Sequence, residues 1–301
     1  MASTAIMNAT QQKQATMRFR WSILARTVGW SETFTEFLMF WLRSSAIIGL
    51  LGILTLPPIV TILLALTPQS VLTTPLAGGI SLRHFRTVLT QPPWPDSLGV
   101  TLGITTTTAI LATILGTGYA VGLGTLAPRG QRMGLLLVLL PMAMPMVVLG
   151  IGLLAVFQLL GIWGQAIGLA IALAIPILPV VVLLVRDGLA AIPPELPAAA
   201  RSLGATPGQV WWRVMWPLLR PTLVTALLMG WVLTLNEAIL TQFLARPPES
   251  ETVAKLIWPK LRYSLSPVIA AASTLLLLLS LPLVLILLRG MRPRSTPSPI
   301  P

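Results

Sequence analysis

The chain has 301 residues, of which 55% are hydrophobic and 9% are charged, and its mean hydropathy is +0.86. Soluble domains carry roughly a quarter charged residues, so this composition excludes an ordinary water-soluble fold. The chain has no cysteine and one histidine, which excludes disulfides and thiol chemistry and argues against a histidine metal site. The net charge of +12 would fit nucleic-acid binding, but it also fits a membrane protein whose basic residues gather on one side.

The first 43 residues are expected to form a cytoplasmic tail. From Trp21 to Arg43, apolar residues recur near helical spacing with charged residues between them, a pattern typical of an amphipathic helix lying along the membrane surface. A cleaved signal peptide is disfavoured because Glu32 and Glu36 interrupt the apolar region.

Residues 44–289 are expected to form an all-α membrane domain with six transmembrane helices. Met133–Val185 contains no Asp, Glu, Lys or Arg and is far longer than the roughly 20 apolar residues that cross a bilayer, so it must cross at least twice. Residues 290–301, rich in Pro and Ser, are expected to be a disordered cytoplasmic tail. The predicted spans are Ser44–Thr67, Ser97–Leu126, Met133–Leu160, Ala166–Val185, Leu218–Leu244 and Pro267–Leu288.

Three of these spans contain prolines, each of which removes a helical hydrogen bond and kinks or breaks the helix. Such breaks are tolerated in a membrane where neighbouring helices or a water-filled cavity satisfy the freed carbonyls. The alternative is that prolines are simply common in membrane helices. The prolines are Pro57 and Pro58 in the first span, Pro141 and Pro145 in the third, and Pro176 and Pro179 in the fourth.

Six spans put both termini on the same side of the membrane. With the N-terminus inside, fourteen of the 20 Lys and Arg residues are cytoplasmic, so the positive-inside rule predicts cytoplasmic termini. This segregation favours membrane lipid over nucleic acid as the surroundings of the basic residues. The six basic residues left outside are Arg83, Arg86, Arg246, Lys255, Lys260 and Arg262.

The loop between the fourth and fifth spans, residues 186–217, is too polar to cross the bilayer and carries helix signals. Pro194 and Glu195 suit a helix start, where a missing amide costs nothing and a carboxylate meets the positive end of the helix dipole. Gly204 suits a left-handed C-terminal cap. The first part of the loop is therefore predicted to be a short helix.

A second short helix is predicted directly after the first. Thr206 is expected to cap it, and it should begin at Pro207 and end by Pro217. A short helix held at the membrane face between two spans can transmit force if it docks in a groove of a soluble partner.

This loop resembles the EAA loop of the permease subunits of binding-protein-dependent ABC importers, in which Glu-Ala-Ala is followed by Gly and then by an apolar residue and Leu-Pro. Two positions depart from the pattern, because Ala198 stands where the family has glutamate and Trp216 where it has leucine. Glu195, one helical turn earlier, is a candidate substitute for the glutamate. The matching residues are Ala199, Ala200, Gly204, Val214 and Pro217.

The resemblance implies a type I importer permease in the bacterial inner membrane. Such a subunit forms half of a heterodimeric pore with a second permease, gated by two ATPase subunits and fed by an extracytoplasmic binding protein. The fragments SLRHF, GWVLTLNEAILTQF and SPVIAAASTLLLLLSL look similar to the second permease of spermidine/putrescine importers and to their aminoethylphosphonate relatives. A polyamine is the expected solute, with aminoethylphosphonate, iron and thiamine left open. The chain has no P-loop, so ATP is expected in a partner and no cofactor or enzymatic activity in this chain.

Glu237 is predicted to lie inside the fifth span, preceded by Asn236. A carboxylate near the centre of a membrane helix costs about 2.5–3.5 kcal/mol, so we expect it to face the pore, where it would offset the desolvation of a cationic solute. Thr234 and Thr241 are further pathway candidates, although a threonine in a span often bonds only its own backbone. Alternatively, Glu237 holds helices together or is solvated near the outer surface.

Two other classes of protein remain as alternatives. A proton-driven secondary transporter would use Glu237, and a membrane-embedded enzyme would need a cluster of His, Asp or Glu inside the bilayer, where only Glu237 is found. We therefore expect no catalytic residue and no metal site. His84 is expected in an external loop, in contact with the binding protein or solvent.

Overall fold

The computed structural model describes residues 36, 37, 39–70, 78–263 and 266–290. Within these ranges the chain is helical apart from turns and a single bridge between Gly164 and Ala245, as the all-α prediction requires. The chain divides into two units, Met1–Val60 and Thr61–Pro301. We describe each by itself.

The first predicted span is present as a helix, Met39–Ala65, of 27 residues. It begins before Ser44 and continues through Pro57 and Pro58, so these prolines do not break it. Most of the amphipathic helix predicted between Trp21 and Arg43 lies outside the described residues, as does the C-terminal tail beyond Gly290.

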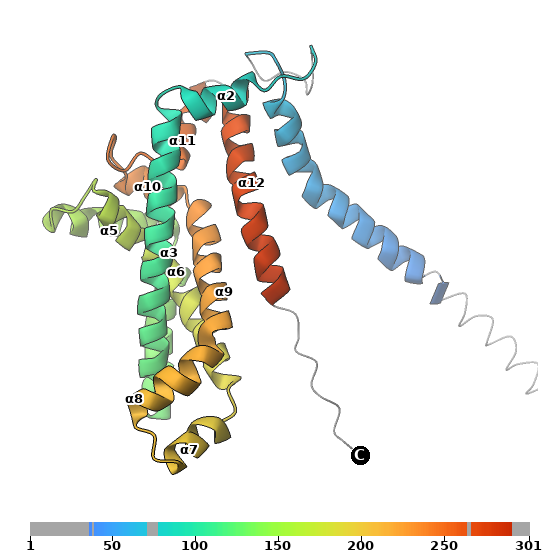
Figure 1. Ribbon diagram of the computed structural model, residues 1–301. Helices are drawn as coiled ribbons and strands as arrows, with labels where there is room; N and C mark the ends of the chain where they lie inside the picture. The colour runs from blue at the N-terminus through green and yellow to red at the C-terminus, as the bar shows by residue number, and fades with distance from the viewer. Residues whose placement is uncertain (1–35, 38, 71–77, 264–265, 291–301) are drawn as a thin grey trace, which may run out of the picture. The chain divides into compact units, whose positions relative to one another are not determined.

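The second unit contains the remaining helices (Figure 1). Five helices of the described chain are long and apolar enough to cross a membrane, or six if one sharply bent pair counts as one span, which agrees with the predicted number. In chain order the helices are α2 (Arg83–Thr90), α3 (Trp94–Gly124), α4 (Pro128–Ala143), α5 (Met146–Leu159), α6 (Ala166–Ala190), α7 (Glu195–Ser202), α8 (Pro207–Val210), the π-helix η1 (Trp211–Met215), α9 (Trp216–Leu235), α10 (Ile239–Leu244), α11 (Val253–Tyr263) and α12 (Pro267–Gly290).

Helices α3, α6 and α9 pack against one another and form the core of this unit. Small residues allow the close approach, as is common where membrane helices meet. A Cβ added at Gly116 of α3 would lie 2.6 Å from Val181 of α6, and one added at Gly188 of α6 would lie 2.6 Å from Thr222 of α9. The helix backbones therefore lie close together at Gly116 and Gly188.

Two of the predicted spans are broken. The third consists of α4 and α5, which meet at an angle of 102°, so it is not one continuous helix from Met133 to Leu160. The break falls at Met144, whose extended backbone (φ −88°, ψ 136°) is the conformation favoured before a proline, here Pro145. The prolines inside α6 do not interrupt that helix.

The fifth predicted span, Leu218–Leu244, is not one continuous helix with these bounds. Its helix starts far earlier, because α8, η1 and α9 run without interruption from Pro207 to Leu235, a length of 29 residues. It also stops at Leu235, and α10 starts only at Ile239. The break at residues 236–238 places Glu237 between two helices rather than inside one.

Candidate functional site: a helical docking element and a cavity between broken helices

The first helix of the loop, α7, ends in a Schellman motif. Gly204 has a φ of +85° and donates its N–H to the carbonyl of Arg201 at 2.9 Å, while Ala205 donates to the carbonyl of Ala200 at 3.1 Å. These two bonds satisfy carbonyls that the helix end would otherwise leave unpaired. The left-handed backbone explains why glycine occupies position 204.

The second helix begins with a capping box. The Thr206 N–H donates to Oε1 of Gln209 at 2.9 Å, and the Gln209 N–H donates to Oγ1 of Thr206 at 3.4 Å. This confirms the predicted cap. The predicted end at Pro217 is wrong, because the helix passes through it. In the π-turn before Pro217 the Trp216 amide donates to the Trp211 carbonyl. The regular α-helical hydrogen bonds are already interrupted at this turn, so the missing N–H of Pro217 removes none of them.

The residues of the EAA-like segment, together with the departing Ala198 and its candidate substitute Glu195, lie on α7 and its C-terminal turn, on η1 and at the start of α9. Glu195, Ala198 and Ala199 are exposed on α7 and Ala200 is half-buried, while Val214 is half-buried on η1 and Pro217 is exposed at the start of α9. Large apolar side chains are also exposed beside them: Leu196 is 45% exposed, Leu203 89% and Trp212 62%. Helices α7 and α8 lie at one end of the unit, away from α2, α10 and α11 (Figure 1).

Glu237 caps α10 at the break in the fifth span. Its Oε1 accepts hydrogen bonds from the amides of Ile239 and Leu240, both at 2.8 Å. A carboxylate at a helix start satisfies free amides and interacts favourably with the helix dipole. The side chain is half-buried. These two bonds offset part of the free energy that it costs to place a carboxylate in an apolar membrane segment.

A cavity of about 230 Å³ lies beside Glu237. It is lined by residues on both sides of the α4–α5 break and by the end of α9, with one wall from α6, so the two breaks open onto the same space. Discontinuous helices that meet in this way build solute sites in many transporters. The lining residues are Met142, Met146, Leu173, Pro176, Ile177, Val180, Leu233 and Glu237.

The other predicted pathway residues do not line this cavity. Thr234 and Thr241 are buried, and their hydroxyls donate to the carbonyls of Gly230 and Ala238, both at 2.7 Å. Asn236 is exposed and donates to the carbonyl of Val232 at 2.8 Å. These three side chains bond local backbone, as the alternative interpretation of the threonines required.

His84 is also placed differently from the expectation. It is 2% exposed, and its Nε2 lies 2.9 Å from the Gln69 carbonyl oxygen, so it packs inside the protein and does not contact solvent. Among the described residues no group of three or more His, Cys, Asp or Glu side chains lies close enough together to hold a metal ion.

The cavity includes residues that sequence reasoning did not name, chiefly Met142, Met146 and Leu233. In the sequence, only Pro145 and Pro176 pointed to this region. They marked potential helix breaks but did not show which residues would line a cavity with Glu237.

Broken spans that share a cavity are a feature of many membrane transport proteins. The chain belongs to the family of binding-protein-dependent transport system inner membrane components, whose family model matches residues 114–294, more than half of the chain. The match includes the loop that resembles the EAA motif. It favours the importer interpretation over a secondary transporter or an enzyme.

Three individual proteins illustrate this similarity. The putrescine transport system permease protein PotI of Escherichia coli strain K12 is 29% identical over 214 residues, which cover 66% of this chain and 73% of PotI. The molybdenum transport system permease protein ModB of Mycobacterium bovis is 30% identical over 166 residues, covering 51% of this chain and 63% of ModB. A bacterial alginate ABC transporter, crystallised with an alginate pentasaccharide-bound periplasmic protein, has the same fold, with a TM-score of 0.62 at 16% identity over 87% of this chain and 95% of that one.

Proposed function

We propose that this permease forms one half of an importer pore, in which α7 and α8 dock on a cytosolic ATPase subunit and the cavity beside Glu237 carries a small cationic solute such as a polyamine. Two ATPase subunits, a second permease and an extracytoplasmic binding protein complete the transporter. The observation that carries this proposal is the unbroken helix from Pro207 to Leu235, because it joins the docking element to the cavity.

The docking element consists of α7, α8 and η1, residues 195–215, and its surface favours a protein partner. Leu196, Leu203 and Trp212 present large apolar side chains beside the EAA-like residues, and exposed apolar groups rimmed by polar ones mark interaction sites. A short helix that offers such a face fits a groove in a soluble subunit.

The helix from Pro207 to Leu235 would carry the movement of the ATPase into the membrane. At 1.5 Å per residue its 29 residues have a path length of about 43 Å along the helix. It ends one residue before the break that holds Asn236 and Glu237. A tilt or shift of this helix therefore changes the wall of the cavity directly.

A cationic solute fits the chemistry of the cavity. Its lining is aliphatic apart from the Glu237 carboxylate, so it offers one negative group and apolar walls for a short alkyl chain. The similarity to PotI supports a polyamine. The similarity to ModB raises a molybdenum species as the rival, and a carboxylate in the cavity would repel any anionic form of it.

The test of the substrate class is charge removal at Glu237. Glu237→Gln keeps an oxygen that can accept the two α10 amides but removes the charge, whereas Glu237→Asp keeps both the charge and a capping group. Radiolabelled putrescine uptake by the whole transporter should fall about tenfold or more in the Gln variant relative to its expression, and much less in the Asp variant. Equal uptake by the Gln variant and the wild type would contradict the assignment.

The proposed orientation has a separate test, because the chain has no cysteine. Ser202 on α7 and Gln91 before α3 are both exposed, so one cysteine at either position would be the only thiol in this chain. A membrane-impermeant maleimide added from outside should label the Gln91→Cys variant and should reach the Ser202→Cys variant only after lysis. Labelling of Ser202→Cys from outside would overturn the docking proposal.

A further inference from the structure

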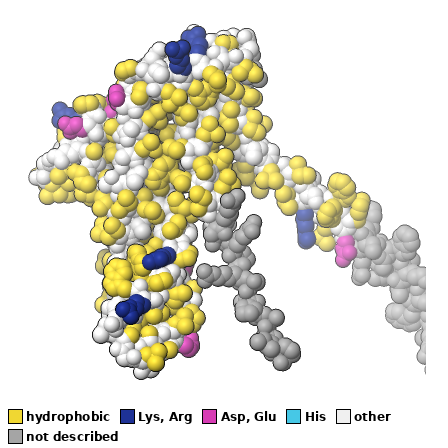
Figure 2. Space-filling model, in the orientation of Figure 1, with side chains coloured by type: hydrophobic (Ala, Val, Ile, Leu, Met, Phe, Trp, Pro, Cys, Tyr) yellow, Lys and Arg dark blue, Asp and Glu magenta, His cyan; other side chains and the backbone are white. Residues whose placement is uncertain are grey.

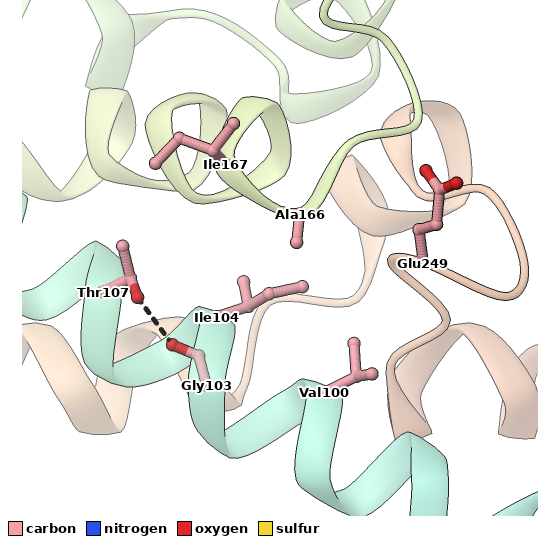
Figure 3. Close-up of a pocket in the computed structure, with 7 residues that line it drawn as sticks. All are labelled: Val100, Gly103, Ile104, Thr107, Ala166, Ile167 and Glu249. Carbon is pink, nitrogen blue, oxygen red and sulfur yellow. Dashed lines mark hydrogen bonds between the residues drawn. The ribbon is translucent and has the colours of Figure 1, made fainter.

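A second cleft lies at the end of the unit opposite the docking element. It has a volume of about 320 Å³ and opens between α3 and the start of α6, beside the loop that joins α10 to α11 (Figure 3). Its walls are aliphatic, and the hydroxyl of Thr107 is already bonded to the Gly103 carbonyl at 2.9 Å. The residues that shape it are Val100, Gly103, Ile104, Ala166, Ile167 and Glu249.

The loop that carries Glu249 is held firmly in place. Ser250 is fully buried, accepts the Arg246 N–H at 2.7 Å and donates to the Gly164 carbonyl at 2.7 Å. The Val253 amide donates to Oγ1 of Thr101 on α3 at 2.9 Å. These bonds fix the backbone of the loop to the turn before α6 and to α3, so the loop keeps Glu249 at the edge of the cleft, while the Glu249 side chain itself is exposed.

The basic side chains nearest this loop in sequence are engaged elsewhere. The Arg246 guanidinium carbon lies 5.3 Å from the centre of the Trp163 ring, and the Lys255 ammonium donates to the Gln242 carbonyl at 2.6 Å. Within the described part of the chain, Glu249 has no ion-pair or hydrogen-bond partner and is the single charged residue that lines the cleft. Its charge is therefore available to a ligand.

We propose that this cleft is an outer binding site for an alkylammonium ion, with the ammonium group at Glu249 and the carbon chain between α3 and α6. Apolar walls with one carboxylate suit an aliphatic amine, whereas an anion would be repelled and a neutral hydrocarbon would not use the charge. Gly103 keeps the cleft open, because nothing lies within 4 Å of a Cβ added there.

The site would receive an amine from the binding protein and hold it before it reaches Glu237. It rests on the proposed function, since it takes the same class of solute, but it uses different residues. Glu249 and Glu237 come from different loops and line different cavities, so the two sites can be tested separately.

The experiment measures radiolabelled putrescine binding to the whole transporter in nanodiscs, without binding protein, in a Glu237→Gln background that leaves the outer site intact. Adding Glu249→Gln should weaken the remaining binding about two- to fivefold, as expected for an exposed charge pair. Gly103→Leu should weaken it further by filling the cleft. Glu251→Gln in the same loop and Gly99→Leu on the same helix are matched controls, because neither residue lines the cleft and Gly99 also has open space around its Cβ position.

Competition distinguishes a charged site from an apolar groove. Butylamine should displace putrescine and 1-butanol should not, and this difference should shrink when Glu249 is replaced by Gln. If Glu249→Gln binds putrescine as well as Glu251→Gln does, and Gly103→Leu as well as Gly99→Leu does, the outer site is overturned. The proposed role of Glu237 would be unaffected by that result. If the wild-type transporter neither binds nor transports putrescine, both proposals fail.

Discussion

Replacing Gly204 by valine tests whether the geometry of the docking element couples ATP hydrolysis to transport. Gly204 closes α7 with a φ of +85°, and a β-branched residue in this left-handed conformation costs about 1–2 kcal/mol. A change of that size shifts a local equilibrium about five- to thirtyfold. The Schellman bonds from Gly204 and Ala205 would be weakened by this amount, and α7 would meet α8 at the native angle in fewer molecules.

The assay is ATP hydrolysis by the purified transporter, stimulated by solute-loaded binding protein. We expect Gly204→Val to lower the stimulation at least several-fold while the complex still assembles in the membrane. Gly204→Asn should be milder because asparagine tolerates the left-handed region. Gly208→Val is the matched control, since Gly208 lies on α8 with open space around it and an ordinary φ. Full stimulation in Gly204→Val, or an equal loss in Gly208→Val, would refute the reasoning from backbone strain.

Three further substitutions probe the architecture. Thr206→Ala removes the capping box of α8 and should destabilise the docking element by about 1 kcal/mol, seen as reduced ATPase stimulation; unchanged stimulation would mean that the cap is dispensable. Gly116→Val adds a side chain at a position where even a Cβ would lie 2.6 Å from Val181. This overpacking should cost about 1–3 kcal/mol and lower the unfolding temperature in detergent. Gly118→Val should not lower it, because the space around Gly118 is open. Ser250→Ala leaves the Arg246 N–H and the Gly164 carbonyl without their Ser250 partner, at a cost of about 1–3 kcal/mol. Hydrogen exchange of the backbone amides in the loop before α11 should become faster. Unchanged exchange rates there would show that the loop is held by other contacts.

The chemistry of the docking element could be predicted from the sequence because it is local. Thr206 bonds an amide three residues away, and Gly204 closes a helix that begins only nine residues earlier. Side-chain size and hydrogen-bonding capacity decide such caps without help from distant parts of the chain. The prediction failed at Pro217, where the helix continues, because the tolerance of a helix for proline depends on the hydrogen-bond pattern and packing around it.

The cavity beside Glu237 was only partly predictable. Glu237 was singled out because a carboxylate in an apolar segment is costly, but its place as the cap of α10 required the break after Leu235. Pro145 signalled the break between α4 and α5, while the continuous α6 shows that a proline alone does not decide where a helix breaks. Nothing in the sequence linked Met146 to Leu233.

The sequence by itself determined that this protein lies in a membrane, that it is built from helices, and that a two-helix element separates two of its spans. These properties follow from hydropathy and from contacts a few residues apart, which any local stretch of chain carries with it. Only the tertiary structure decided which breaks share a cavity and that Glu249 and Gly103 line the same cleft (Figure 3). Helix packing sets these distances, and it depends on small residues such as Gly116 and Gly188 meeting partners far away in the chain. Few basic side chains appear among the many hydrophobic ones on the face that Figure 2 shows, and this sparse charge is what the sequence predicts for a membrane protein.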